Sequence, residues 1–237
     1  MKIIETKDYT ELSLTACAVM ESMIAEKPDC VIVLATGDSP VGAYKFFTEN
    51  IKSKGTDVSR VRFVKLDEWL GLPHNHISTC ENFLDTHIIS PLNIDGSNYI
   101  SFNSETADSA GECKRIEEWL VQNGPVDLCV LGLGVNGHLG LNEPSDRFLP
   151  FCHTVAISEE TSKHQMLSKT DTVITKAVTL GMADILSSGK ILFLVTGEAK
   201  SEALNRFMSA EVTPECPCSA LWLHRNVTCL INKSDYL

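Results

Sequence analysis

The chain has few basic residues for its length. Its 237 residues include 20 Lys and Arg against 31 Asp and Glu, which gives a formal net charge of −11. Nucleic acids and anionic membranes attract basic surfaces, so we expect neither as a partner. An anionic small molecule, by contrast, would need basic side chains placed locally around it.

Long apolar runs are also missing. No stretch approaches the ~20 apolar residues that cross a bilayer, and no signal peptide opens the sequence. Nine cysteines could indicate disulfides, but Cys30 and Cys129 lie inside apolar strand patterns, as reduced core residues do. We therefore expect a cytoplasmic protein with free thiols.

Little in the sequence is typical of a metal site. Residues 216–218, Cys-Pro-Cys, hold the one close cysteine pair, which lacks the two intervening residues and the second pair of a zinc site. His74 and His76 follow a proline turn with no cysteine nearby, which favours a solvated loop. We expect no bound metal.

Short apolar runs alternate with helical patterns along the whole chain, and no Pro, Gly or Ser-rich linker divides it. This alternation is typical of a parallel sheet covered by helices on both faces. We predict one domain, residues 1–237, with a modified Rossmann-like three-layer α/β/α fold and a mainly parallel sheet of about seven strands. The predicted strands are residues 30–35, 61–66, 98–102, 126–131, 177–180, 191–196 and 227–231. The predicted helices are residues 12–26, 40–54, 79–89, 106–122, 159–167 and 200–209.

The most informative segment is a glycine-rich loop directly after the apolar run 126–131. It begins at the carboxyl end of a predicted strand, where open α/β sheets place their ligands. Gly134 and Gly137 let the backbone approach a ligand and present amide groups to it. His138 follows the third glycine, and this histidine and the mid-chain position argue against a dinucleotide site, although the letters fit its fingerprint. The alternative for His138 is a residue that only closes a turn.

This loop, residues 132–144, resembles the active-site loop of the glucosamine-6-phosphate deaminase and isomerase family. Residues 63–73 resemble that family's strand ending in Asp-Glu-aromatic. Residues 34–40 resemble its first strand and phosphate loop, and residues 195–200 a later loop with a phosphate-binding lysine. The four blocks follow the family's order and span most of the chain.

Within the family, the resemblance is greatest to the galactosamine-6-phosphate deaminase/isomerase branch, through residues 63–69, 79–81 and 128–134. It implies an aldose–ketose isomerisation with loss of ammonia, galactosamine 6-phosphate giving tagatose 6-phosphate, and no cofactor. Two other functions stay open: a 6-phosphogluconolactonase, which shares the fold and a related histidine loop, and a non-catalytic sugar-phosphate sensor.

The resemblance also implies catalytic roles. Asp67 would move a proton between C2 and C1 of the open-chain sugar, a step that a carboxylate at a strand end can reach. His138 would shuttle protons during ring opening, and Glu143 would hydrogen-bond the histidine. We expect Glu68 to be structural. The alternative for Asp67 is a helix cap or an ion pair with Lys65.

A phosphate site is expected where the first loop meets a helix. Ser39 and Pro40 have the form of an N-cap and a first helical residue, and together with Gly37 they could receive a phosphate at the helix N-terminus. Lys200 could converge on the same place. Asp38 favours an ordinary cap instead, since a carboxylate repels phosphate.

The family's phosphate-binding arginine is missing, because the chain has no arginine between positions 147 and 206. Leu167 falls near its expected place. Lys163, His164 or Lys169 could substitute, and we favour a charged His164, although none of them reproduces a bidentate guanidinium.

Asn136 is a second departure, because the family's deaminases have aspartate there. An amide cannot stabilise imidazolium as a carboxylate does, so we expect a lower pKa for His138 than in a relative that has aspartate at this position. Either Glu143 alone tunes the histidine, or the enzyme is a poor catalyst. The short tail after residues 227–231 also lacks the C-terminal extension of the hexameric deaminases, and we expect a monomer or small homo-oligomer.

Overall fold

The apolar runs form a seven-stranded parallel sheet in the computed structural model, which describes residues 1–236. The strand order is β1-β10-β9-β6-β2-β3-β5. Its strands are β1 (Lys2–Thr6), β2 (Val31–Leu34), β3 (Arg62–Lys65), β5 (Tyr99–Ile100), β6 (Leu128–Gly132), β9 (Lys190–Val195) and β10 (Val227–Asn232).

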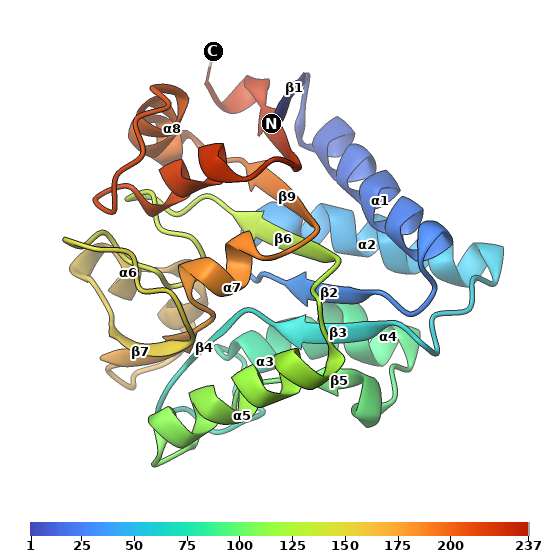
Figure 1. Ribbon diagram of the computed structural model, residues 1–237, viewed down its shortest axis with the longest axis horizontal. Helices are drawn as coiled ribbons and strands as arrows, with labels where there is room; N and C mark the ends of the chain where they lie inside the picture. The colour runs from blue at the N-terminus through green and yellow to red at the C-terminus, as the bar shows by residue number, and fades with distance from the viewer. Residues whose placement is uncertain (237) are drawn as a thin grey trace.

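Helices cover both faces of this sheet, which confirms the three-layer prediction (Figure 1). The α-helices are α1 (Tyr9–Glu26), α2 (Asp38–Lys54), α3 (Cys80–Leu84), α4 (Ser90–Leu92), α5 (Ser109–Asn123), α6 (Glu159–Ser162), α7 (Met182–Leu186) and α8 (Ser201–Met208). Shorter helical turns are Asp85–Ile89, Gly96–Asn98, Gln165–Lys169, Glu198–Lys200, Pro217–Leu223 and Lys233–Asp235. No helix within residues 1–236 is both long and apolar enough to span a membrane.

Strand β2 shows how one short apolar run serves both layers. Val31 and Val33 pack in the cluster that includes residues of α5, α7 and α8. Ile32 and Leu34 pack in the opposite cluster, with α1 and α2. Successive side chains of a strand point to opposite faces, so a strand buried on both faces is apolar at every position. The continuous apolar pattern therefore predicted this strand correctly.

A second, antiparallel sheet was not predicted. It has the order β4-β8-β7, from β4 (Asp67–Trp69), β8 (Lys176–Thr179) and β7 (His153–Ala156). Residues 177–180, predicted in the main sheet, lie here instead, and β1 supplies the seventh parallel strand. Pairing partners of a short apolar run depend on tertiary packing, which periodicity does not encode.

The start of one predicted helix and the end of another differ from expectation. The cap of α2 is Gly37, with φ at +93°, and not Ser39, whose Oγ lies 2.9 Å from Thr196 Oγ1. The predicted helix 159–167 ends early, because α6 stops at Ser162 and His164 caps a separate turn. Both differences lie at the carboxyl edge of the sheet, towards which the arrows of β2, β3 and β6 point in Figure 1.

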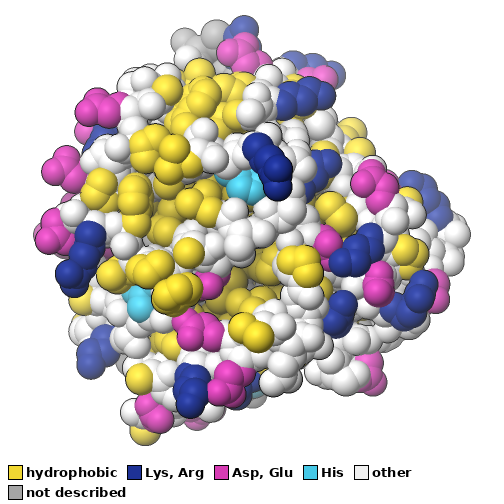
Figure 2. Space-filling model, viewed as in Figure 1, with side chains coloured by type: hydrophobic (Ala, Val, Ile, Leu, Met, Phe, Trp, Pro, Cys, Tyr) yellow, Lys and Arg dark blue, Asp and Glu magenta, His cyan; other side chains and the backbone are white. Residues whose placement is uncertain are grey.

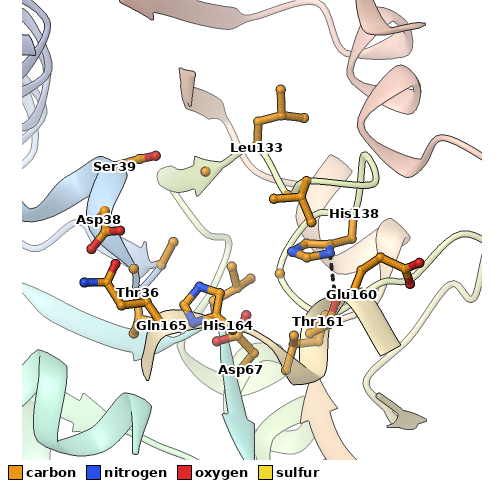
Figure 3. A pocket seen from close by; sticks show the side chains of 18 of the residues that line it. Thr36, Asp38, Ser39, Asp67, Leu133, His138, Glu160, Thr161, His164 and Gln165 are labelled. Carbon is orange, nitrogen blue, oxygen red and sulfur yellow. Dashed lines mark hydrogen bonds between the residues drawn. The ribbon is translucent and has the colours of Figure 1, made fainter. Parts of the chain in front are cut away.

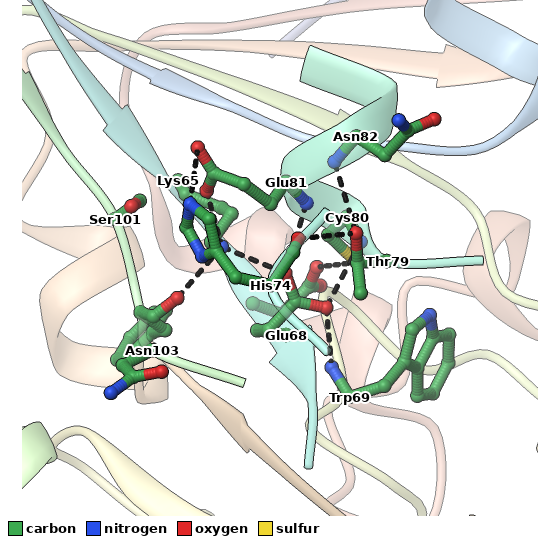
Figure 4. Close-up of polar contacts among 12 residues, drawn as sticks. Lys65, Glu68, Trp69, His74, Thr79, Cys80, Glu81, Asn82, Ser101 and Asn103 are labelled. Carbon is green, nitrogen blue, oxygen red and sulfur yellow. Dashed lines mark hydrogen bonds and ion pairs between the residues drawn. The ribbon is translucent and has the colours of Figure 1, made fainter. Parts of the chain in front are cut away.

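A buried ion cluster fixes the corner where β3 passes into β4 (Figure 4). The Lys65 ammonium is fully buried and lies 2.7 Å from both the Glu68 and the Glu81 carboxylates. It also donates to the Phe102 carbonyl at 2.8 Å. Glu68 accepts the backbone N–H groups of Cys80 and Glu81, both at 2.9 Å, at the start of α3. The structural role predicted for Glu68 is therefore confirmed.

We expect Lys65→Met to destabilise the fold by about 3–5 kcal/mol, because it leaves two buried carboxylates without a cation. Urea unfolding measures the loss. Adding Glu68→Gln and Glu81→Gln should recover part of it, while Lys114→Met, at an exposed pair with Glu118, should cost under ~1 kcal/mol. An equal loss in the single and the triple variant would contradict this account.

Candidate active site

A cavity of about 340 Å³ opens at the carboxyl edge of the large sheet (Figure 3). Its walls come from the loops after β2, β6 and β9, from β4, and from the segment around α6. This is the edge at which open α/β sheets bind ligands. The sequence-predicted residues that line it are Gly37, Ser39, Asp67, Gly134, His138, His164 and Lys200.

Asp67 is the acid on the cavity floor. Side chains alternate along β4, so Asp67 and Trp69 face the cavity while Glu68 points back to Lys65. Asp67 is 7 % exposed. Burial raises the pKa of its carboxyl to about 7, and the charge of nearby Glu68 acts in the same direction. Since Lys65 pairs with Glu68 and Glu81, the ion pair considered for Asp67 is not formed.

The His138 loop depends on two glycines. The Gly134 N–H donates to the His138 carbonyl at 3.1 Å, and the Gly137 N–H donates to the Gly134 carbonyl at 3.1 Å. A Cβ on Gly134 would lie 2.1 Å from His138 Cδ2, so the ring occupies the space where a side chain would be. Gly137 has φ at +90°, which other residues rarely adopt. Gly134 therefore shapes the cavity wall, and Gly137 turns the loop.

Glu143 and Asn136 support the histidine from behind. Glu143 Oε2 lies 3.8 Å from His138 Nδ1 and accepts a hydrogen bond from Asn136 Nδ2 at 2.8 Å. Asn136 Oδ1 accepts from the His138 backbone N–H at 3.2 Å. The Asn136 side chain thus holds the Glu143 carboxylate and the His138 backbone, and within residues 1–236 it makes no hydrogen bond to the imidazole ring.

The His138 ring is held in its neutral form. Burial lowers the pKa of His138 to about 4, the Glu143 carboxylate opposes this, and Lys200 and His164 add to it. Burial is the first cause of this low pKa, and a lower pKa than in an Asp-bearing relative stays a prediction. Thr161 Oγ1 lies 3.4 Å from Nδ1, so Nε2 is the nitrogen left for the cavity (Figure 3).

The other end of the cavity suits an anion. Gly37, with positive φ, begins α2, and the position of a Cβ on it would lie 3.7 Å from His164 Nε2. His164 Nδ1 accepts the Met166 N–H at 3.2 Å, which leaves the proton on Nε2 in the neutral ring. Burial lowers the pKa of both His164 and Lys200. His164 therefore presents a neutral Nε2 donor to the cavity, and its charge beside a bound phosphate stays a prediction.

The two other substitutes for the missing arginine are less well placed. Lys163 lines the cavity, but its ammonium pairs with Glu159 at 2.9 Å, and Lys169 does not line it. Sequence reasoning missed Thr161 at the histidine and Ser158, whose Oγ donates to Glu143 Oε1 at 3.3 Å. The Ser-Glu-Glu segment at the start of α6 is recognisable in the sequence as a helix cap. Nothing in the sequence indicates that Ser158 contacts Glu143.

Comparison with known proteins agrees with this geometry. A family model described as "Glucosamine-6-phosphate isomerases/6-phosphogluconolactonase" matches residues 7–230. The chain belongs to this family. It is 45% identical over 228 residues, 96% of this chain and 90% of the relative, to AgaI of Escherichia coli (strain K12), which carries the provisional name of a deaminase. It is 37% identical over 235 residues, 98% of this chain and 96% of the relative, to a glucosamine-6-phosphate deaminase of Clostridium botulinum (strain Kyoto / Type A2).

Solved structures of family members place the chain in the same fold. A monomeric glucosamine-6-phosphate deaminase matches with a TM-score of 0.94 and 33% identity, over 99% of this chain and 98% of that one. A 6-phosphogluconolactonase from Trypanosoma brucei matches with a TM-score of 0.80 and 18% identity, over 99% and 97%. The second likeness shows the shared fold alone.

In residues 1–236, no group of three or more His, Cys, Asp or Glu side chains is arranged to hold a metal ion.

We expect Asp67→Asn to make the protein more stable at pH 8. The folded-state pKa of Asp67 is raised to about 7 from 3.8, so folded protein binds more protons than unfolded protein between these values. Stability is therefore lost as the pH rises through this window, and the neutral amide avoids a loss on the order of a few kcal/mol. Urea unfolding at pH 8 and pH 4 measures it. A stability difference that is the same at both pH values would show that Asp67 ionises normally.

Proposed function

We propose that this protein is an amino-sugar phosphate deaminating isomerase. The observation that carries the proposal is a buried carboxylate whose pKa is raised to about 7, facing the same cavity as a neutral histidine backed by Glu143. At the other end of the cavity the Lys200 cation, the His164 donor and the N–H groups at the start of α2 fit the phosphate, and the Asp38 carboxylate in the same wall opposes it. The deaminase names of the relatives at 45% and 37% identity support it.

The proposed reaction begins with ring opening. His138 takes the proton of the C1 hydroxyl through Nε2 and delivers a proton to the ring oxygen. Asp67 then removes the C2 proton while the C1 carbonyl oxygen takes a proton from water, which gives an enol-amine; Asp67 returns its proton to C1, and the C2–N bond becomes an iminium. Water adds to C2, the C–N bond breaks, and ammonia leaves a ketose phosphate. A base with a pKa near 7 is suited to both directions of this proton transfer. The scheme draws only on the chain's own side chains and water.

The substrate we propose is galactosamine 6-phosphate, which gives tagatose 6-phosphate. The support is the resemblance of residues 63–69 and 79–81 to the galactosamine branch, and the greater identity to AgaI than to the Clostridium relative. We also propose that residues 1–237 act as one domain and as a monomer or small homo-oligomer, since the matched solved deaminase is monomeric.

No partner other than the sugar phosphate is proposed. The chain carries a net charge of −11, and on the face shown in Figure 2 basic side chains are scattered among acidic ones without a continuous basic patch. Binding of nucleic acid or an anionic membrane would require such a patch. The local cation of the cavity is Lys200, which suits one small anion.

The test is ammonia release from glucosamine 6-phosphate and galactosamine 6-phosphate in parallel. We expect release from the galacto substrate, lost in Asp67→Asn and retained in Glu211→Gln, an exposed acid far along the chain. Release from the gluco substrate alone would reassign the sugar. No ammonia release from either sugar, together with hydrolysis of 6-phosphogluconolactone, would establish the lactonase. Tight binding of a sugar phosphate without any product would establish a sensor.

We expect Asn136→Asp to leave the rate on galactosamine 6-phosphate unchanged or lower. The new carboxylate raises the pKa of His138 but removes the donor to Glu143 and repels it. Steady-state kinetics of the two proteins measure the change, with Asn226→Asp on the surface as a control. A large gain in rate would show instead that Asn136 impairs the proton relay.

A further inference from the structure

Cys80, the first residue of α3, contacts the carboxylate of Asp67. Its side chain is buried, at 1 % exposed, and its Sγ donates to Asp67 Oδ1 at 3.5 Å. On the other side, Thr36 Oγ1 donates to the same sulfur at 3.4 Å. Thr36 directly precedes Gly37 at the proposed phosphate end, so this chain of donors joins that loop to the acid.

The direction of these hydrogen bonds is set by the thiol. Burial raises the pKa of Cys80 well above its usual range, and the charges of Glu68 and Asp67 add to this effect. The sulfur therefore keeps its one hydrogen near neutral pH. Because Thr36 supplies its own hydrogen to the sulfur, the thiol hydrogen is available for Asp67.

The second oxygen of Asp67 is left for the substrate. Oδ2 lies 3.3 Å from the position that a Cβ on Gly140 would take, and Gly140 lines the cavity. Within residues 1–236 no hydrogen-bond donor contacts Oδ2. One oxygen is thus held by the thiol, and the other has no such tether and lies beside a residue that lines the cavity.

We propose that Cys80 is a positioning residue that holds the Asp67 carboxylate through Oδ1 and presents Oδ2 to the substrate carbon. This inference rests on the proposed function. The helix start that carries the thiol is itself fixed, since Glu68 accepts the Cys80 N–H and Thr79 Oγ1 accepts the Asn82 N–H at 3.0 Å (Figure 4). A thiol held in this way by neighbouring groups keeps its orientation without the substrate.

Other groups around Asp67 do not replace this donor. The charges that act on it are those of Glu68, on β4, and Lys65, on β3, and these two pair with each other. Tyr44 of α2 and Cys129 of β6 are buried and neutral, with pKa values raised by burial. Two further polar groups are Thr179 of β8, beside Gly140, and His164, which lines the same cavity as Asp67.

The test compares Cys80→Ala and Cys80→Ser with the native enzyme on the substrate that it turns over. A hydrogen bond to a carboxylate favours its charged form, so its loss raises the pKa of Asp67. For Cys80→Ala we expect kcat to fall on the order of tenfold with little change in KM. The acid limb of the kcat–pH profile should move to higher pH by up to about one unit. Cys80→Ser retains a donor and should restore both.

A merely structural role would give different results. Cys229→Ala removes an equally buried thiol in β10 and should lower the melting temperature without moving the pH profile. If Cys80→Ala behaves like Cys229→Ala, or if folded Cys80→Ser does not restore the profile, the proposal is wrong. Circular dichroism and thermal unfolding of each variant establish that it is folded.

Infrared spectroscopy tests the contact without turnover. The S–H stretching band that disappears in Cys80→Ser should shift as Asp67 is titrated, and this shift should be absent in Asp67→Asn. If the native protein releases no ammonia, the proposed function fails while this measurement still decides whether the thiol holds the carboxylate. A Cys80 band that does not respond to pH would overturn the positioning role.

Discussion

The active-site corner depends on how the charge of Lys65 is neutralised in the protein interior. The ammonium has no access to water, and Glu68 and Glu81 lie at hydrogen-bonding distance on either side of it. Through its second set of contacts, Glu68 also fixes the backbone at the start of α3. Strand β4, which carries Asp67, and helix α3, which carries Cys80, are therefore held by the same carboxylate. A buried ion pair adds little net stability, but it imposes one arrangement on the groups that surround it.

Burial acts on the two proposed proton carriers in opposite directions, and both shifts favour the neutral form. The pKa of Asp67 rises to about 7 and that of His138 falls to about 4. Near neutral pH the carboxyl is therefore shared between its two forms, while the imidazole is ready to accept a proton. The Glu143 carboxylate limits the fall in the pKa of His138, and a hydrogen bond from Asn136 holds that carboxylate in place. Burial of Asp67 gives the site a base that works near neutral pH, but it lowers the stability of the fold. Asp67→Asn would restore that stability.

Much of the fold was predictable because strands buried on both faces are apolar at every position. The runs at β2, β6, β9 and β10 were found in this way, and the order of helix and strand implied the layers. The three strands of the second sheet were not recognised as a sheet, because β4 spans only Asp67–Trp69 and β7 is half exposed. Ser39 was misread as a cap because its hydroxyl finds Thr196, which is remote in the sequence.

By itself, the sequence determined which chemical groups are present and where each meets its strand: Asp67 at the end of one, the His138 loop after another, and Lys200 after a third. The family follows from the same segments, because their order and spacing are local properties of the chain. Only the tertiary structure decided that His164 is a neutral donor, that Asn136 binds Glu143 through its side chain, and that Cys80 contacts Asp67. These depend on distances and burial, which arise when residues far apart in the chain pack together and exclude water.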